Sequence, residues 1–437
     1  MKKKYLRYLL ASFGSALIMS IYSLVDTICV GQYHGEVGTA ALAITLPLWT
    51  IIFSLGFLFG IGGAALMTSF KAEKDERKAN EYYTLAVISI LVVVIFLWIF
   101  INVFYKQILI FFGADNEMVF NLASKYIYWM RVGLPLFMFS PFLGGFIRND
   151  KAPLKATIGT ISGGCVNVIG DILFVFTFDM GISGAGLATM LGQAFMALIL
   201  MSHYLSKNCS LKFARPTNTL SKLKNIIIIG LPSFVLDIAL GIVTILYNKQ
   251  IVTYLEGNEE TATLAIFGVA CNVLALVQSM GYAVGQAGQP LISESYGKGE
   301  AEEVKSYLRY GIIASFSVSI VVTTLVMISP NLIVKSFIDT SNSLLVLELA
   351  PSILRKFFLT FLLIIFNINT IYFFQAVLKG AASFTLSLLK GLILPAIFLL
   401  ILPLISFNLI WYTLFLVELI VFSLSIFFIK KIKIRYN

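Results

Sequence analysis

Apolar stretches of about 20 residues recur along the whole chain and are separated by short polar segments. A helix of this length crosses a hydrocarbon core of about 30 Å. The pattern therefore predicts an all-α integral membrane protein with twelve transmembrane helices. We place them near residues 8–30, 37–69, 84–105, 121–147, 157–177, 180–204, 225–255, 261–293, 307–330, 343–378, 383–404 and 407–428.

Composition strengthens this prediction. Of 437 residues, 59% are hydrophobic and 12% are charged, whereas roughly 25% are charged in an ordinary soluble domain. The four cysteines show no paired spacing, so neither a disulfide framework nor a metal site is indicated; they are Cys29, Cys165, Cys209 and Cys271.

The net charge of +10 indicates topology rather than a nucleic-acid partner, because the basic residues gather in alternate loops. One side carries Lys2, Lys3, Lys4, Arg7, Lys71, Lys74, Arg77, Lys78, Arg148, Lys151, Lys155, Lys207, Lys212, Arg215, Lys222, Lys224, Lys298, Lys305, Arg309, Lys430, Lys431, Lys433 and Arg435. The other side has few cations beyond Lys106 and Lys335. By the positive-inside rule, both termini are expected in the cytoplasm of a bacterial cell, at its inner membrane.

The chain also repeats itself. ALAIT at Ala41 recurs as TLAIF at Thr263, 222 residues later, and GIGGAALMTSF at Gly60 matches GQAGQPLISES at Gly285 after 225 residues. Two copies of six spans share one orientation, so we expect two six-helix lobes related by a pseudo-two-fold axis along the membrane normal. The predicted lobes are residues 1–205 and 224–437, joined by a cytoplasmic linker at 206–223.

Four oxygen-bearing side chains are predicted to meet in the outer half of the first lobe. Asp26 lies near the outer end of span 1 and Asp171 near that of span 5, while Asn167 precedes Asp171 by one helical turn. Thr189 lies at similar depth in span 6. Ionisable groups inside a membrane are costly, and oxygen ligands suit a proton or Na⁺. The alternative is a structural role, in which these polar groups join helices.

The second copy lacks this set. Asp26 shifted by 222 residues falls on Asn248, and span 11 has no acid where span 5 has Asp171. Asp237, in span 7, is a possible second-lobe acid.

Other polar residues are expected to be structural. Glu418 has no obvious partner, Arg131 pairs within the first half, and Lys390 extends to the interface. His34 and His203 are expected at the interface too.

Several function classes lack support. The chain has no phosphate-binding loop for ATP, no cluster of His, Cys and carboxylates typical of a metalloenzyme, and no nucleophile–base pair. We therefore expect no enzyme, no cofactor other than H⁺ or Na⁺ as coupling ion, and no metal beyond Na⁺ at the same site.

The ordered motifs resemble the multidrug and toxic compound extrusion (MATE) family. They are VDTICVG at Val25, IRNDKAP at Ile147, N-x-x-x-D at Asn167, GAGLAT at Gly184, GLPS at Gly230 and GQAGQPLIS at Gly285. The resemblance covers nearly the whole chain and implies a V-shaped pair of lobes with cation coupling at Asp26, Asn167, Asp171 and Thr189. It departs in span 1, where related exporters often have a proline near Ala11; Gly14 is the remaining candidate for a bend.

The predicted function is a secondary antiporter that exports lipophilic or cationic drugs or metabolites in exchange for H⁺ or Na⁺. Its partners are expected to be organic cations and the bilayer, and the chain is expected to be a monomer. The closest alternative is a lipid-linked saccharide flippase. Cavities of that kind tend to be strongly cationic, whereas spans 1, 2, 7 and 8 carry no Arg or Lys well inside the membrane. An integral-membrane enzyme is the more distant alternative.

Overall fold

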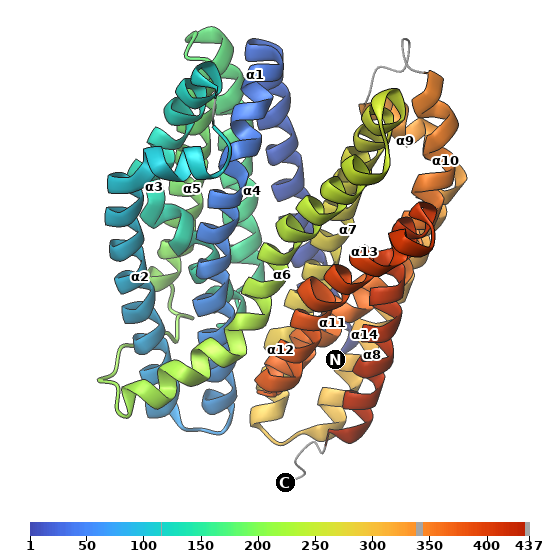
Figure 1. Cartoon of the computed structure of the whole chain (residues 1–437). Helices are drawn as coiled ribbons and strands as arrows, with labels where there is room; N and C mark the ends of the chain where they lie inside the picture. Colours follow the sequence, from blue (N-terminus) through green and yellow to red (C-terminus); the bar gives the residue numbers. More distant parts are fainter. Residues whose placement is uncertain (115, 338–343, 433–437) are drawn as a thin grey trace.

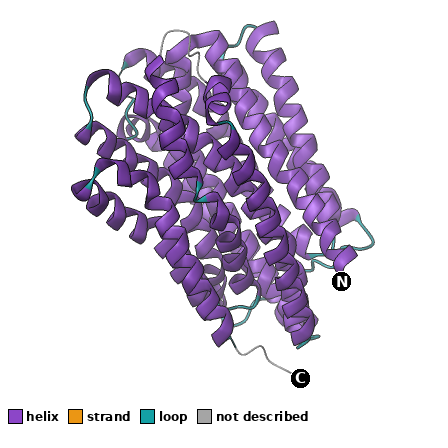
Figure 2. Ribbon diagram, turned by 90° about the vertical axis from the view of Figure 1, so that its right-hand side faces the viewer, coloured by secondary structure: helices purple, strands orange, loops and turns teal. Residues whose placement is uncertain are grey.

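The computed structural model describes residues 1–114, 116–337 and 344–432, and this part of the chain is helical with no strand (Figure 2). The predicted start of span 10 at residue 343, together with Lys433 and Arg435, lies outside the described residues. In chain order the elements are α1 (Lys2–Ala72), α2 (Glu76–Phe111), α3 (Glu117–Asn149), α4 (Pro153–Gly170), η1 (Asp171–Thr177), α5 (Ile182–Met201), η2 (Ser202–Leu205), α6 (Thr219–Tyr254), α7 (Gly257–Gly297), α8 (Ala301–Ile328), α9 (Pro330–Phe337), α10 (Leu344–Phe358), α11 (Phe361–Ala376), α12 (Gly380–Leu388), η3 (Leu389–Ile393), α13 (Leu394–Ile405), η4 (Phe407–Tyr412) and α14 (Thr413–Lys431).

Among the described residues, 12 helical segments are long and apolar enough to cross a membrane, which confirms the predicted number of spans. Spans 1 and 2 form one continuous element, α1, and the predicted loop between them shrinks to a break at Gly35 (φ 61°, ψ −146°). Glycine adopts this left-handed conformation without the steric penalty that a Cβ brings. Gly14 keeps helical backbone angles, so α1 has no break at the position where a bend was considered.

The helices form two lobes arranged as a V, with α1–α5 on one side and α6–α14 on the other (Figure 1). The lobes diverge toward one end and approach each other at the other, where backbones meet closely. A Cβ added to Gly230 of α6 would lie 2.0 Å from the carbonyl oxygen of Leu58 in α1. Any larger residue at Gly230 would therefore force the lobes apart at this contact.

The first turns of α1 contact the second lobe, although the chain then continues into the first. Tyr5 packs against Tyr310 of α8 with ring centroids 5.8 Å apart, and Lys4 forms an ion pair of 2.9 Å with Glu294 of α7. Lys151 and Lys298 approach the same carboxylate at 3.3 and 3.1 Å. The base of the V is thus held together by charge as well as by close backbone packing.

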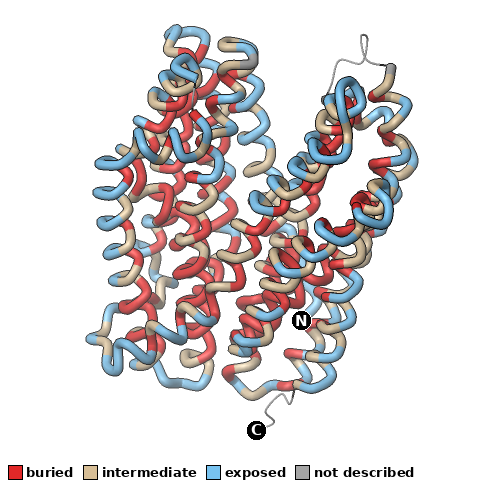
Figure 3. Tube along the Cα trace, viewed as in Figure 1, coloured by how far each residue is buried: buried red, intermediate tan, exposed pale blue. Residues whose placement is uncertain are grey.

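Large apolar side chains remain exposed on the flanks of both lobes, while buried residues line the contacts between helices (Figure 3). In α2, for example, Val92, Ile95, Phe96 and Ile99 are exposed. Such a surface suits lipid tails, since apolar side chains exposed to water over this area would promote aggregation. The chain is a multi-pass membrane protein.

Candidate functional site

A row of polar side chains in mutual contact crosses the first lobe from helix to helix. Asn167 of α4 donates a hydrogen bond of 3.1 Å from Nδ2 to Oγ1 of Thr189 in α5. Thr189 in turn donates to the carbonyl oxygen of Ala185. On its other side Thr189 lies beside the hydroxyl of Tyr126, which donates a hydrogen bond of 3.0 Å to Oδ2 of Asp26. The row of polar side chains therefore links α1, α3, α5 and α4.

Asp171 adds a second carboxylate behind this row of polar side chains. It is the first residue of η1, a π-helical turn, and its side chain is completely buried. Neither carboxylate oxygen of Asp171 accepts a hydrogen bond from the described residues, and Oδ1 of Asp26 and Oδ1 of Asn167 accept none either. Asp171 lies close enough to Asp26 for the two carboxylates to interact electrostatically. Three side chains thus hold acceptor oxygens that no donor among the described residues satisfies.

Small residues let α4 and α5 approach closely enough to build this layer. A Cβ added to Gly163 would lie 2.6 Å from the carbonyl oxygen of Gly192, and one added to Gly170 would lie 2.8 Å from the Cβ of Ala188. The pair of helices is therefore in near-backbone contact on both sides of Asn167 and Thr189. Small residues at membrane helix contacts allow such packing.

A central cavity of 430 Å³ lies between the lobes. It is within the size range of pockets that bind drug-like molecules. Asp26 and Thr189 line it from the first lobe, whereas Asn167 and Asp171 lie behind the wall. A small cleft of 20 Å³ inside the first lobe is lined by Asn167 and Thr189, enough for about one water molecule.

The cavity wall combines apolar and aromatic groups with a few acids. From the first lobe it includes Met19, Tyr22, Trp49, Phe53 and Phe57. Aromatic faces attract cations as well as apolar surface.

The possible second-lobe acid, Asp237, lines the cavity from α6 and lies beside the hydroxyl of Tyr282 in α7. Two carboxylates from opposite lobes, Asp26 and Asp237, therefore line one cavity.

Arg148 is a cavity residue that the sequence interpretation missed. The sequence pattern places it among the cytoplasmic loop cations, but its side chain lies at the C-terminal end of α3 and lines both the central cavity and the small cleft. Helix α3 extends to Asn149, beyond the predicted span end, and Arg148 in its last turn reaches Gln286 of α7 in the second lobe. The one available signal was its place directly before N-D-K in a motif of the family.

The ion pair of the second lobe corrects one prediction and supplies a partner that the sequence does not reveal. Glu418 of α14, expected to be structural with no obvious partner, forms an ion pair with Lys390 of η3 and accepts a hydrogen bond of 2.6 Å from Nδ2 of Asn367 in α11. Lys390 is buried rather than extended to the interface. An ammonium group buried beside a carboxylate avoids the cost of an unpaired charge, which is why the side chain turns inward.

Arg131 and His203 each have a partner within the first lobe. Arg131, expected to pair within this half, has its guanidinium 4.0 Å from the ring centroid of Tyr105 in α2 and forms no ion pair among the described residues. His203, expected near a span end, lies at the end of span 6, and its side chain is buried with Nε2 2.8 Å from Oδ2 of Asp150.

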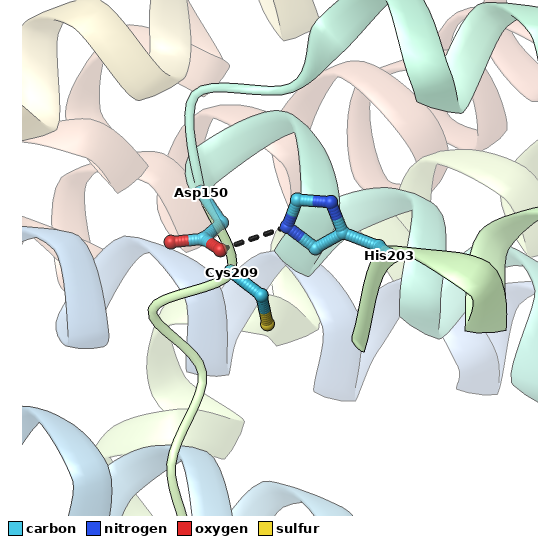
Figure 4. Close-up of side chains that lie close together, drawn as sticks. All are labelled: Asp150, His203 and Cys209. Carbon is cyan, nitrogen blue, oxygen red and sulfur yellow. Dashed lines mark hydrogen bonds and ion pairs between the residues drawn. The ribbon is translucent and has the colours of Figure 1, made fainter. Parts of the chain in front are cut away.

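The Asp150–His203 pair belongs to a cluster that the cysteine spacing had not indicated (Figure 4). Ligand atoms of Asp150, His203 and Cys209 lie within 4.8 Å of one another. Asp150 also accepts hydrogen bonds from the backbone N–H and hydroxyl of Ser210, and Lys71 lies 3.7 Å from its Oδ1. With a nearby ammonium group and these donors already on the carboxylate, the cluster is best explained as the anchor of residues 206–210 to the first lobe.

Comparisons with known proteins agree with this arrangement. The MatE family model matches residues 11–173 and 249–399, well over half of the chain. A multidrug export protein, MepA, from Staphylococcus saprophyticus is 24% identical over 391 residues, covering 88% of this chain and 83% of the relative.

Solved structures share the fold. A multidrug resistance MATE family transporter of the MOP superfamily, in an outward-facing conformation, superposes with a TM-score of 0.89 at 20% identity and covers 98% of this chain and 94% of its own. A MOP superfamily transporter from Pyrococcus furiosus, for which the reverse polarity of its binding pocket suggests a different function, gives 0.88 at 19% identity with coverage of 98% and 94%. With twelve spans in two lobes and a match across both repeats, the chain belongs to the MatE family.

Proposed function

We propose that the protein is an ion-coupled antiporter that exports lipophilic or cationic small molecules in exchange for H⁺ or Na⁺. The observation that carries this proposal is the buried pair Asp26 and Asp171, whose free acceptor oxygens have no cationic partner among the described residues. Burying carboxylates in this way is costly unless they bind a proton or a cation. The multidrug export name of the relatives supports the same substrate class.

Asp26 connects the two halves of the proposed cycle. It lines the central cavity and also interacts electrostatically with Asp171 inside the first lobe. A cationic substrate in the cavity and a coupling ion behind its wall would therefore compete for the same negative charge. Ion entry from outside favours one packing of the first lobe and substrate binding favours the other, which couples the two fluxes.

The family alternatives differ in cavity charge. The central cavity carries one arginine and two carboxylates, so it is not the strongly cationic surface expected for a pyrophosphate-linked saccharide. The fold itself does not identify the substrate, because a multidrug resistance transporter and a transporter for which a different function is suggested superpose on this chain with TM-scores of 0.89 and 0.88. Cavity charge is therefore the feature that favours drug export.

The remaining parts of the proposal concern place and assembly. We infer that the protein is a monomer in the bacterial inner membrane, that both termini face the cytoplasm, and that it is a transporter rather than an enzyme, with no cofactor besides the coupling ion. The basic loops at the closed end of the V support this orientation.

The test uses the purified protein in vesicles loaded with a fluorescent organic cation, with a proton or a sodium gradient imposed. One gradient should drive dye transport in the wild type. Asp171→Asn should reduce gradient-driven transport by a factor of about ten or more, because the coupling free energy between an ion site and a substrate site typically corresponds to a factor of this size. Transport of Asp171→Asn at the wild-type rate would contradict the assignment.

A matched control is available on the same segment. Asp179 lies eight residues after Asp171, is exposed, and accepts a hydrogen bond from the Tyr33 hydroxyl. Asp179→Asn removes the same charge outside the lobe core and should leave gradient-driven transport unchanged.

A further inference from the structure

Arg148 differs from the other buried cations of the described chain. Lys222 is buried beside Glu81, and Lys390 beside Glu418. Arg148, 8% exposed, has no carboxylate within ion-pair distance among the described residues, and its Nη1 donates a hydrogen bond of 2.6 Å to the neutral Oε1 of Gln286 in α7. A buried guanidinium with no counter-charge is unfavourable, so its retention in a cavity indicates that an anion is supplied from elsewhere.

The surroundings of Arg148 fit an anionic group. Gln286, Tyr372 and Ser233 line the same cavity, and the Tyr372 hydroxyl lies beside both of the other side chains. Hydroxyl and amide groups beside a guanidinium can donate further hydrogen bonds to an anion bound there. A carboxylate fits such a site, because the planar guanidinium group can donate two parallel hydrogen bonds to it. The acids of this cavity, Asp26 and Asp237, do not form ion pairs with Arg148.

The second half of the repeat shows that the scaffold does not require a cation at this position. Arg148 lies three residues before Lys151 (φ 64°), which ends the turn after α3, and Gln375 lies three residues before Leu378 (φ 56°), the equivalent turn after α11. Gln375 is fully buried and donates hydrogen bonds of 2.7 and 3.0 Å to the Ile229 carbonyl oxygen and the Ser233 hydroxyl. A neutral amide therefore serves this position of the fold in the second lobe.

We propose that Arg148 forms an anion subsite in the central cavity, so that the preferred substrates are amphoteric molecules that carry a carboxylate as well as a cationic group. The carboxylate binds Arg148, and the cationic group lies toward Asp26 or Asp237. This inference rests on the proposed export function and specifies its substrate class. It also differs from the expectation of purely cationic substrates.

The test compares two dyes that differ in one charge: a rhodamine with a free carboxylate and its methyl ester, which keeps the cationic ring system. Binding is measured by fluorescence anisotropy on purified protein in detergent, without any ion gradient. The wild type should bind the free acid more tightly than the ester. Arg148→Gln, which copies the second lobe, should weaken binding of the free acid by about tenfold or more and leave the ester unchanged.

Two further variants separate charge from packing. Arg148→Lys keeps the cation without the planar fork and should retain part of the preference for the free acid. Arg131→Gln removes an arginine from the same helix but outside the cavity, and should leave both dyes unaffected. If Arg148→Gln weakens both dyes equally, or if Arg148→Lys behaves like Arg148→Gln with no remaining preference, the subsite is overturned.

Competition identifies the source of the anion. Micelles containing phosphatidylglycerol, compared with micelles of phosphatidylcholine alone, should not displace the free-acid dye. Selective displacement by the anionic lipid, lost in Arg148→Gln, would overturn the amphoteric assignment in favour of a lipid phosphate. Because binding needs no gradient, a charge preference without ion-driven transport would refute the antiporter and not the subsite.

Discussion

Both lobes bury acids inside membrane-spanning helices, but they treat these acids differently. In the first lobe Asp26 and Asp171 share no cation among the described residues, and three of their four carboxylate oxygens accept no hydrogen bond. In the second lobe Glu418 is neutralised by Lys390 and accepts a hydrogen bond from Asn367. Depth in the membrane therefore does not separate the two kinds of acid, whereas a neutralising cation does, and we propose ion binding for the first-lobe pair that lacks one.

The π-helical turns sharpen this contrast. Spans 5 and 11 each contain one, and each carries an ionisable residue: Asp171 in η1 and Lys390 in η3. A π turn is a strained local feature that often accompanies functional sites. Here the same feature accompanies an acid without an ion pair among the described residues in one lobe and a paired lysine in the other, and we propose only the first as a site for a mobile ion.

The largest expected effect is on Glu418. Glu418→Gln leaves Lys390 buried without a counter-charge, which should lower the free energy of unfolding by about 3–5 kcal/mol. Unfolding in mixed detergent micelles, followed by tryptophan fluorescence, measures it. Wild-type stability in this variant would show that the second-lobe pair is as dispensable as a surface pair and would remove the contrast between the lobes.

A double variant serves as its control. Lys390→Met with Glu418→Leu removes both charges and keeps similar volume, so stability should recover to within about 1 kcal/mol of the wild type. Failure to recover would indicate that lost packing, rather than an unpaired charge, destabilises the single variant.

A medium effect is expected at Tyr126. Tyr126→Phe removes the hydroxyl that donates to Asp26, while the ring remains. A hydrogen bond to a charged group contributes about 1.5 kcal/mol, so the concentration of coupling ion for half-maximal transport should shift by about tenfold. The measurement is dye transport in vesicles at a series of ion concentrations. An unchanged half-maximal concentration would separate Tyr126 from the ion site.

The smallest effect is expected on the stability of Asp171→Asn, in contrast to its large effect on transport. The Asp171 carboxylate accepts no hydrogen bond from the described residues, so the substitution deletes no contact and removes a buried charge. Its free energy of unfolding should stay within about 1 kcal/mol of the wild type. A loss as large as that of Glu418→Gln would make Asp171 a structural acid and erase the distinction between the lobes.

The sequence predicted many residues of the site but few of the hydrogen bonds and ion pairs between side chains. The one-turn spacing of Asn167 and Asp171 placed both on one helix face, and the hydrogen bond between Asn167 and Thr189 agrees with the expected neighbourhood. The partnership of Lys390 and Glu418 was missed, because hydropathy does not reveal which face of span 11 turns toward span 12. Arg148 was missed for a related reason: an arginine near a span end reads as a topology signal.

What the sequence by itself determined can be read along the chain: twelve apolar segments, two related copies of six, and acids in the outer halves of spans 1 and 5. Span length, charge bias and repeats are all read from residue order along one chain, and none of them requires knowing which helices touch. Only the tertiary structure decided which buried charges have partners, since a partner comes from a helix far away in sequence. The packing of helices that are distant in sequence brings Asp26 near Asp171, pairs Lys390 with Glu418, and leaves Arg148 lining the cavity with no ion-pair partner among the described residues.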